Sequence, residues 1–339
     1  MLRASAPLRL DLAGGTLDIY PLYLLLDGGL TLNGAITCYA RVELEEHAGQ
    51  EIGLIAEDLS LEERFPSLEE LDFAGELGLV KRLIKFCNPP GGIGLRTRVE
   101  APPGAGLGGS SALALTVCAA LQALSGERAA LPDLIPLVRD LEAQTLGVPA
   151  GVQDYYAAGY GGLNAIWLGP GEERREELRL SATFLKELER GLILGHTGVA
   201  HCSGRLNWEV FKRFIDGEAG VRRALGQVKE AALKMYEALR AEDLEGVGRA
   251  LRAEWAARRR LAPQIAPAGA ERLIARALER GALGAKLCGA GGGGALLALT
   301  REGARAEVEL ALQEEGVRLL PFEFAARGLE VCAAETDGL

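Results

Sequence analysis

The sequence is poor in the side chains that most often hold zinc. It has three histidines and six cysteines in 339 residues, and the cysteines are scattered without a CxxC pair. His196, His201 and Cys202 lie close together in the chain, but no fourth ligand is evident. We therefore expect these three to be ordinary polar loop residues, and most cysteines to be small buried residues.

Long apolar runs and excess positive charge are also missing. No stretch approaches the length of about 18 apolar residues that spans a membrane, and the N-terminus lacks a signal-peptide pattern, so we expect a cytoplasmic location. The net charge is -10, whereas surfaces that bind nucleic acids or anionic membranes need concentrated positive charge. We expect a small soluble partner and neither a nucleic acid nor a membrane.

Apolar residues make up 48% of the chain, which is enough for two ordinary cores. The first half is rich in strand patterns and the second is mainly helical, which predicts an α+β protein with domains over 1–180 and 181–339. Expected elements of the first half are strands over 29–45 and 95–101, a buried helix after residue 108, a helix over 132–146 and a hairpin around 169–174. Those of the second half are helical stretches over 205–242 and 244–261, and strands over 284–300 and 316–332 around another helix.

The chain has no G-x-x-x-x-G-K-[ST] motif, which excludes a P-loop. The G-x-G-x-x-G pattern of dinucleotide sites occurs twice, over 104–109 and 289–294, so each match has little specificity. The chain also lacks an evident βαβαβ alternation, which makes a nicotinamide oxidoreductase a weak alternative.

The first glycine loop is followed at once by Ser110 and Ser111, at the start of the buried helix. Unpaired N–H groups and the positive dipole end of a helix suit a polyphosphate, and glycines let it approach the backbone. Serine hydroxyls then reach a phosphate or its metal ion. The alternative is that Ser110 only caps the helix.

Three segments resemble the motifs of the GHMP kinases (galactokinase, homoserine kinase, mevalonate kinase, phosphomevalonate kinase). They are APLRLDLAGGTLDIY at 6–20, PPGAGLGGSSAL at 102–113 and AKLCGAGGGGALLAL at 285–299. Their order and their spread over the chain make the resemblance specific. PLRLDLAGG, GVQDYYAAGYGG and KLCGAGGGG are most similar to the heptose-7-phosphate kinase and fucokinase branch.

This resemblance implies an N-terminal domain like ribosomal protein S5 domain 2 and a ferredoxin-like C-terminal domain, with the active site between them. It also implies transfer of the γ-phosphoryl group of ATP, with Mg²⁺, to a hydroxyl of a sugar or sugar phosphate by a monomer or homodimer. A non-sugar alcohol such as mevalonate or an inositol is an alternative acceptor. A regulator that binds ATP or sugar without turnover is an alternative function.

The resemblance also assigns roles to individual residues. Asp154 is expected to be the general base, with Arg9 beside it holding it ionised. The alternatives are that Asp154 only caps a loop and that Arg9 is an ordinary surface arginine. Residues expected to contact ATP are Pro103, Gly104, Ala105, Gly106, Leu107, Gly108, Gly109, Ser110 and Ser111.

Mg²⁺ is expected on Glu142 and Ser110. Ser111 is an alternative hydroxyl and Asp140 a competing carboxylate. Residues expected at the acceptor are Gly15, Asp18, Gly161, Gly162, Gly291, Gly292 and Gly293. The chain departs from the nearest branch at Leu17, where a hydroxyl is expected, which puts the usual sugar specificity in doubt.

Overall fold

The computed structural model describes residues 1–199 and 203–333. In this part of the chain, the first sheet has the strand order β12-β1-β2-β5-β3-β4, and β6 and β7 continue it from β2. The strands are β1 (Leu2–Ala13), β2 (Gly29–His47), β3 (Ile52–Ala56), β4 (Leu61–Phe65), β5 (Gly92–Val99), β6 (Leu163–Gly169), β7 (Glu172–Glu177) and β12 (Glu330–Ala333). The long strand β2 pairs with β6 through its first residues and with β5 through its last.

The helices of the first half are α1 (Gly78–Cys87), α2 (Gly109–Leu124), α3 (Leu131–Leu146) and α4 (Gln153–Tyr160). Helix α2 is buried over most of its length because its residues are almost all small or apolar. Helix α3 has a proline in its first turn and ends at Gly147, which adopts the left-handed conformation that favours glycine. These observations confirm the expected helix over 132–146 and the buried helix after the glycine loop.

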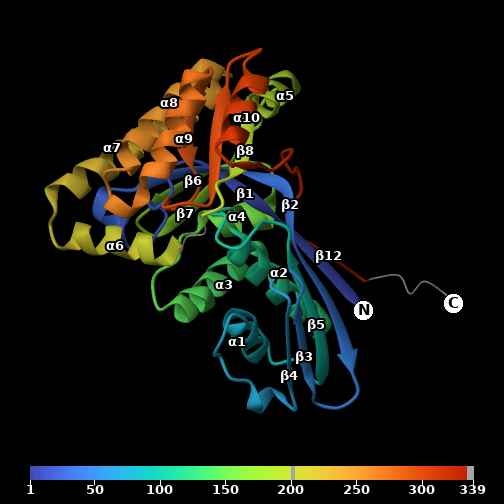
Figure 1. The fold of residues 1–339 in the computed structure, drawn as a ribbon. Helices are drawn as coiled ribbons and strands as arrows, with labels where there is room; N and C mark the ends of the chain where they lie inside the picture. Colours follow the sequence, from blue (N-terminus) through green and yellow to red (C-terminus); the bar gives the residue numbers. More distant parts are fainter. Residues whose placement is uncertain (200–202, 334–339) are drawn as a thin grey trace.

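The second sheet has the order β11-β8-β10-β9. Its strands are β8 (Leu192–His196), β9 (Ala282–Leu287), β10 (Ala295–Thr300) and β11 (Arg318–Leu319). The remaining helices are α5 (Ala182–Gly191), α6 (Ser203–Ile215), α7 (Ala219–Arg240), α8 (Leu244–Arg258), α9 (Ala268–Glu279) and α10 (Arg305–Glu314). Of these, α5, α8, α9 and α10 pack on the sheet. Figure 1 shows α8 to α10 beside this sheet and α7 on the far side of α8, with α1 to α3 at the opposite end of the molecule and α4 between them.

Two sequence expectations differ from the structure. The amphipathic stretch over 205–242 is two helices, because the chain turns at Gly217, whose φ is +82°. The last strand, β12, pairs with β1, Leu2 lying opposite Ala333. The strand near the C-terminus therefore belongs to the sheet of the N-terminal half, although the expected domain boundary at 180/181 assigns it to the C-terminal domain.

Strand β1 separates two kinds of side chain. Leu8, Leu10 and Leu12 are buried in the apolar core, while Arg9 and Asp11 alternate with them and point to the opposite face. The same core cluster includes Leu297 of β10, so the two halves are packed together. Arg9 and Asp11 are themselves buried, which requires charged partners for both.

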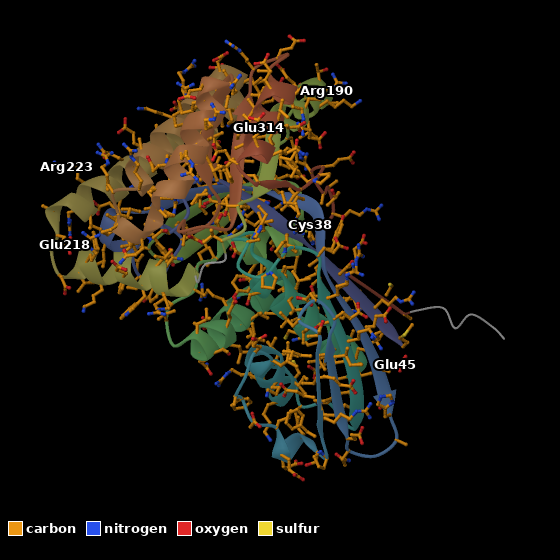
Figure 2. All side chains as sticks on the ribbon, viewed as in Figure 1. Cys38, Glu45, Arg190, Glu218, Arg223 and Glu314 are labelled. Atoms are coloured by element: carbon orange, nitrogen blue, oxygen red, sulfur yellow. The ribbon has the colours of Figure 1, made fainter. Side chains whose placement is uncertain are left out.

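Charges of both signs cover the outside of the molecule. Figure 2 shows Glu218 and Arg223 at the edge of the C-terminal half, and Arg190 and Glu314 on the same half. Among the described residues, no helix combines the length and the apolar character needed to cross a membrane.

Candidate active site

A cavity of about 420 Å³ lies where the first glycine loop meets the N-termini of α2 and α4. This volume is typical of small-molecule sites. The loop is held from two sides, since the N–H of Arg9 donates to the carbonyl of Leu107 and the N–H of Ala295 donates to that of Ala105. One bond comes from β1 and the other from β10, so both halves of the protein fix the loop.

Gly108 is the N-cap of α2 and has a φ of +75°. Because it has no side chain, it cannot bond the free N–H groups in the first turn of α2, and this turn borders the cavity. A Cβ on Gly108 would lie 3.0 Å from Cγ of Asp154, so the glycine also allows Asp154 to approach the loop. The loop geometry is that of an anion site at a helix N-terminus.

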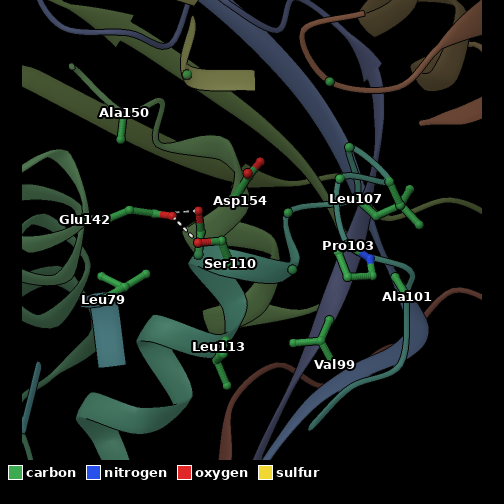
Figure 3. A pocket seen from close by; sticks show the side chains of 18 of the residues that line it. Leu79, Val99, Ala101, Pro103, Leu107, Ser110, Leu113, Glu142, Ala150 and Asp154 are labelled. Atoms are coloured by element: carbon green, nitrogen blue, oxygen red, sulfur yellow. Dashed lines mark hydrogen bonds between the residues drawn. The ribbon is translucent and has the colours of Figure 1, made fainter. Parts of the chain in front are cut away.

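The hydroxyls of Ser110 and Ser111 both donate to the carboxylate of Glu142, at 2.6 and 2.7 Å. Tyr155 donates a third hydroxyl to the same carboxylate. Figure 3 shows Glu142 reaching from α3 to the start of α2, with Asp154 beside them. Ser110 is exposed to the cavity and Ser111 is buried. The reading of Ser110 as a cap is wrong, because it follows the N-cap and bonds Glu142.

Glu142 is buried, and burial raises its pKa. The three hydroxyl donors act in the opposite direction because they stabilise the ionised form. Its competitor Asp140 is exposed and pairs with Arg139. Unlike Asp140, Glu142 therefore presents a desolvated carboxylate to the cavity, and a bound cation would stabilise its charge.

Arg9 and Asp154 form an ion pair, with 2.7 Å between Nε and Oδ1. Arg9 is only 5% exposed, so the reading of a surface arginine is wrong. Burial disfavours its charge, but Asp154 and Asp11 outweigh burial, and the pKa of Arg9 is raised. Its Nη1 also donates to the carbonyl of Gly106. One guanidinium therefore connects the glycine loop to the first turn of α4.

Another end of the cavity is lined by Thr16, Asp18 and Asn207. The hydroxyl of Thr16 donates to Oδ1 of Asn207 at 2.9 Å, and Oδ2 of Asp18 accepts the N–H of Gln153 at 3.0 Å. Leu17 is fully buried in the apolar core and does not face the cavity. The hydroxyl at this end of the cavity is therefore supplied by Thr16.

Burial raises the pKa of Asp18 to about 6. The N–H of Gln153 lowers it and the charges of Asp154 and Asp11 raise it further, both by smaller amounts. The carboxyl of Asp18 is thus able to change between donor and acceptor of a hydrogen bond near neutral pH.

Apolar side chains line the remaining part of the cavity. They come from α1, β5, the start of α2 and the segment after β3, and include Leu59, Leu77, Leu79, Val80, Val99 and Leu113. Figure 3 shows Leu79, Leu113 and Val99 below Glu142 and Asp154 in this view. This part suits a flat apolar group beside the anion site.

The glycines expected at the acceptor do not line the cavity, and several of them pack closely on neighbouring segments. Gly161 packs on the backbone of Arg327 and Gly328, and the N–H of Gly162 donates to Ala325. The expected residues that do not line this cavity are Gly15, Gly161, Gly162, Gly291, Gly292 and Gly293.

The second glycine run instead supports the first. Gly289 and Ala290 line the cavity, and a Cβ on Gly294 would lie 2.6 Å from the carbonyl of Ala105. Gly291 packs on Ile265 and Gly293 on Val199. Gly294 is therefore required by close packing on the first glycine loop, and Gly291 and Gly293 by close packing on other segments.

Sequence reasoning missed Thr16, Asn207, Gln153 and Tyr155. Thr16, Gln153 and Tyr155 lie inside the motifs quoted above, which was a signal that could have found them, but nothing near Asn207 in the chain indicates the cavity. The described residues hold no group of three or more His, Cys, Asp or Glu side chains that could bind a metal. His201 and Cys202 lie outside the described residues, and His196 ends β8.

Asp18→Asn should change how stability depends on pH. Because the pKa of Asp18 is above its unfolded value, its contribution to the free energy of unfolding is present below about pH 4 and lost as the pH rises through about 6. Relative to the variant, the wild type should lose about 3 kcal/mol between pH 4 and 7 in urea denaturation. Asp216→Asn controls for the loss of an exposed carboxylate. If the free energy of unfolding depended on pH in the same way in the wild type and in Asp18→Asn, the raised pKa of Asp18 would be contradicted.

Comparisons with known proteins agree with this geometry. Residues 77–162 match the GHMP kinases N terminal domain, and residues 235–318 match the GHMP kinases C terminal domain. A D-glycero-alpha-D-manno-heptose 7-phosphate kinase of Campylobacter jejuni is 28% identical over 335 residues, covering 97% of this chain and 98% of the relative. A galactokinase of Thermococcus kodakarensis is 26% identical, covering 95% of each.

The crystal structure of a D-glycero-D-manno-heptose 1-phosphate kinase of Bacteroides thetaiotaomicron is also similar. It superposes with a TM-score of 0.82 at 25% identity, covering 99% of this chain and 100% of that one. The mixed helix and sheet fold in two domains is therefore confirmed. The chain belongs to the GHMP kinase family and is a phosphotransferase that acts on a hydroxyl acceptor.

Proposed function

We propose that this kinase transfers the γ-phosphoryl group of ATP to a hydroxyl of a sugar or sugar phosphate, with Asp154 as the general base. The observation that carries the proposal is the placement of Asp154. It lies between the glycine loop at the N-terminus of α2 and the polar end formed by Thr16, Asp18 and Asn207. A base at that position reaches both the donor and the acceptor.

The triphosphate is assigned to the loop from Gly104 to Ser111, and adenine to the apolar part of the cavity. The N–H groups of the first turn of α2 and the guanidinium of Arg9 stabilise the charge of the transferred group. Arg9 also orients the Asp154 carboxylate through the ion pair. Asp154 then accepts the proton of the acceptor hydroxyl as the hydroxyl oxygen bonds to the γ-phosphorus, while the bond from that phosphorus to the bridging β-phosphate oxygen breaks and ADP leaves.

Magnesium fits the donor set of Glu142 and Ser110. A buried carboxylate with hydroxyls around it supplies the oxygen ligands that this hard cation prefers, and few protein ligands suffice because Mg²⁺ also takes phosphate oxygens and waters. When bound, Mg²⁺ would neutralise charge on the phosphates. The exposure of Ser110 to the cavity favours it over Ser111 as the hydroxyl ligand.

A sugar acceptor is supported by the chemistry of the polar end. A carboxyl, an amide and a hydroxyl there offer both donors and acceptors, which suits a ligand with several hydroxyl groups. The heptose kinase and galactokinase to which the chain is similar phosphorylate sugars according to their names. A cytoplasmic location, a monomeric or homodimeric state and the lack of nucleic-acid or membrane partners stay predictions from the sequence.

The test is release of ADP from ATP and Mg²⁺ with a panel of hexoses, heptose 7-phosphates, inositols, mevalonate and homoserine. A sugar or sugar phosphate should stimulate release, and Asp154→Asn should lower turnover by about 10³-fold while ATP affinity stays almost intact. Asp140→Asn is the matched control, since that carboxylate is exposed on α3. Stimulation only by a non-sugar alcohol, or wild-type turnover in Asp154→Asn, would contradict the proposal.

Glu142→Gln should raise the Mg²⁺ concentration for half-maximal turnover by about tenfold or more. The amide keeps the size of the side chain and can still accept from the serines, but it lacks the charge that holds the cation. Asp140→Asn again serves as control, and its titration should match the wild type. An unchanged Mg²⁺ titration in Glu142→Gln would remove Glu142 from the metal site.

A further inference from the structure

Four charged side chains are fully buried together beside the cavity. They are Asp11 of β1, Glu254 and Arg258 of α8, and Lys286 of β9. Nζ of Lys286 lies 3.2 Å from carboxylate oxygens of both Asp11 and Glu254. Nη2 of Arg258 lies 2.5 Å from Glu254 and 4.0 Å from Asp11. Two positive and two negative charges therefore balance in one desolvated cluster, which we call the buried quartet.

Stability alone does not explain the buried quartet. Burying ions is unfavourable, and apolar side chains of similar volume often stabilise a core equally well or better. None of the four residues lines the cavity, so none acts directly on a bound molecule there. The quartet does, however, connect β1 of the first sheet to α8 and β9 of the C-terminal half.

Arg258 has donors that leave the quartet. Its Nη2 donates to the carbonyl of Gly15 at 2.8 Å, and its Nη1 donates to the hydroxyl of Thr16 at 3.2 Å. These bonds reach the segment that carries Thr16 and Asp18 into the cavity. A guanidinium can make them together with its carboxylate pair because its donors form a rigid fork.

Thr16 needs such support. Its φ is +73°, which is unfavourable for a β-branched residue and persists only where the surroundings hold it. In this conformation its hydroxyl accepts from Arg258 and donates to Asn207 of α6. The path from Arg258 to the cavity therefore has two steps, first to Thr16 and then to Asn207.

We propose that Arg258 is a positioning residue for the acceptor: the buried quartet fixes its guanidinium, which holds Gly15 and Thr16 so that Thr16, Asn207 and Asp18 face the acceptor hydroxyls. Arg258 thereby sets the acceptor specificity without touching the acceptor. The inference rests on the proposed function, because that function assigns this end of the cavity to the acceptor.

Arg258→Lys is the most direct test. Lysine keeps the positive charge beside Asp11 and Glu254, but one ammonium cannot also bond Gly15 and Thr16 in the same geometry. With a heptose 7-phosphate and galactose as acceptor probes, KM for the probe that is phosphorylated should rise at least about tenfold, while KM for ATP stays within about twofold.

The matched control is Arg305→Lys. Arg305 also pairs with a glutamate on its own helix, Glu309, and donates to a backbone carbonyl, that of Leu192, but neither of these partners lines the cavity. This variant should leave both KM values as in the wild type. Equal acceptor KM in Arg258→Lys and Arg305→Lys would overturn the proposal.

Thr16→Val is a second test of the same proposal, and it applies even if Arg258→Lys does not fold. Valine keeps the branched shape and leaves the buried quartet intact, but it removes the hydroxyl between Arg258 and Asn207. KM for the acceptor should again rise while KM for ATP does not. The double variant should raise the acceptor KM little more than either single variant, because both substitutions break the same hydrogen bonds from Arg258 through Thr16 to Asn207. An unchanged acceptor KM in Thr16→Val would overturn the proposal.

Asp18→Asn separates this inference from the proposed function. If Asp18→Asn leaves the acceptor KM unchanged, the acceptor end is misassigned and both fail. If Asp18→Asn raises it while Arg258→Lys and Thr16→Val do not, the acceptor end stands and the positioning role of Arg258 is overturned.

Discussion

Arg9 occupies the point where three parts of the molecule meet. Its side chain donates to Asp154 at the start of α4 and to the carbonyl of Gly106, and its backbone N–H donates to Leu107. A buried guanidinium that lost its carboxylate would be strongly destabilising, so β1, the glycine loop and α4 stay together. The relative position of the proposed base and the proposed phosphate site depends on this one side chain.

Much of the donor side of the site could be predicted from the sequence. Glycines and serines at the start of an almost wholly apolar helix indicate an anion site, and Gly104–Ser111 has that place in the structure. Asp154, Glu142 and Arg9 were named through the resemblance, and the structure brings all three to one cavity.

The acceptor side could not be predicted to the same extent, because it depends on contacts between distant residues. Thr16 meets Asn207 and Arg258, which lie 191 and 242 positions further along the chain. The orientation of Leu17 into the core follows from the left-handed backbone at Thr16, which no local pattern indicates. The glycines near 161 and 291 were misplaced for a related reason, since a glycine can serve a ligand or a neighbouring backbone equally well.

The measurement that tests the central claim most directly is a crystal structure with Mg²⁺, a non-hydrolysable ATP analogue and the acceptor found in the panel. The account predicts the triphosphate along Gly104–Ser111 and one acceptor hydroxyl within hydrogen-bond distance of the Asp154 carboxylate. It also predicts the rest of the acceptor against Thr16, Asp18 and Asn207. A triphosphate bound elsewhere, or an acceptor whose hydroxyls all lie away from Asp154, would contradict it.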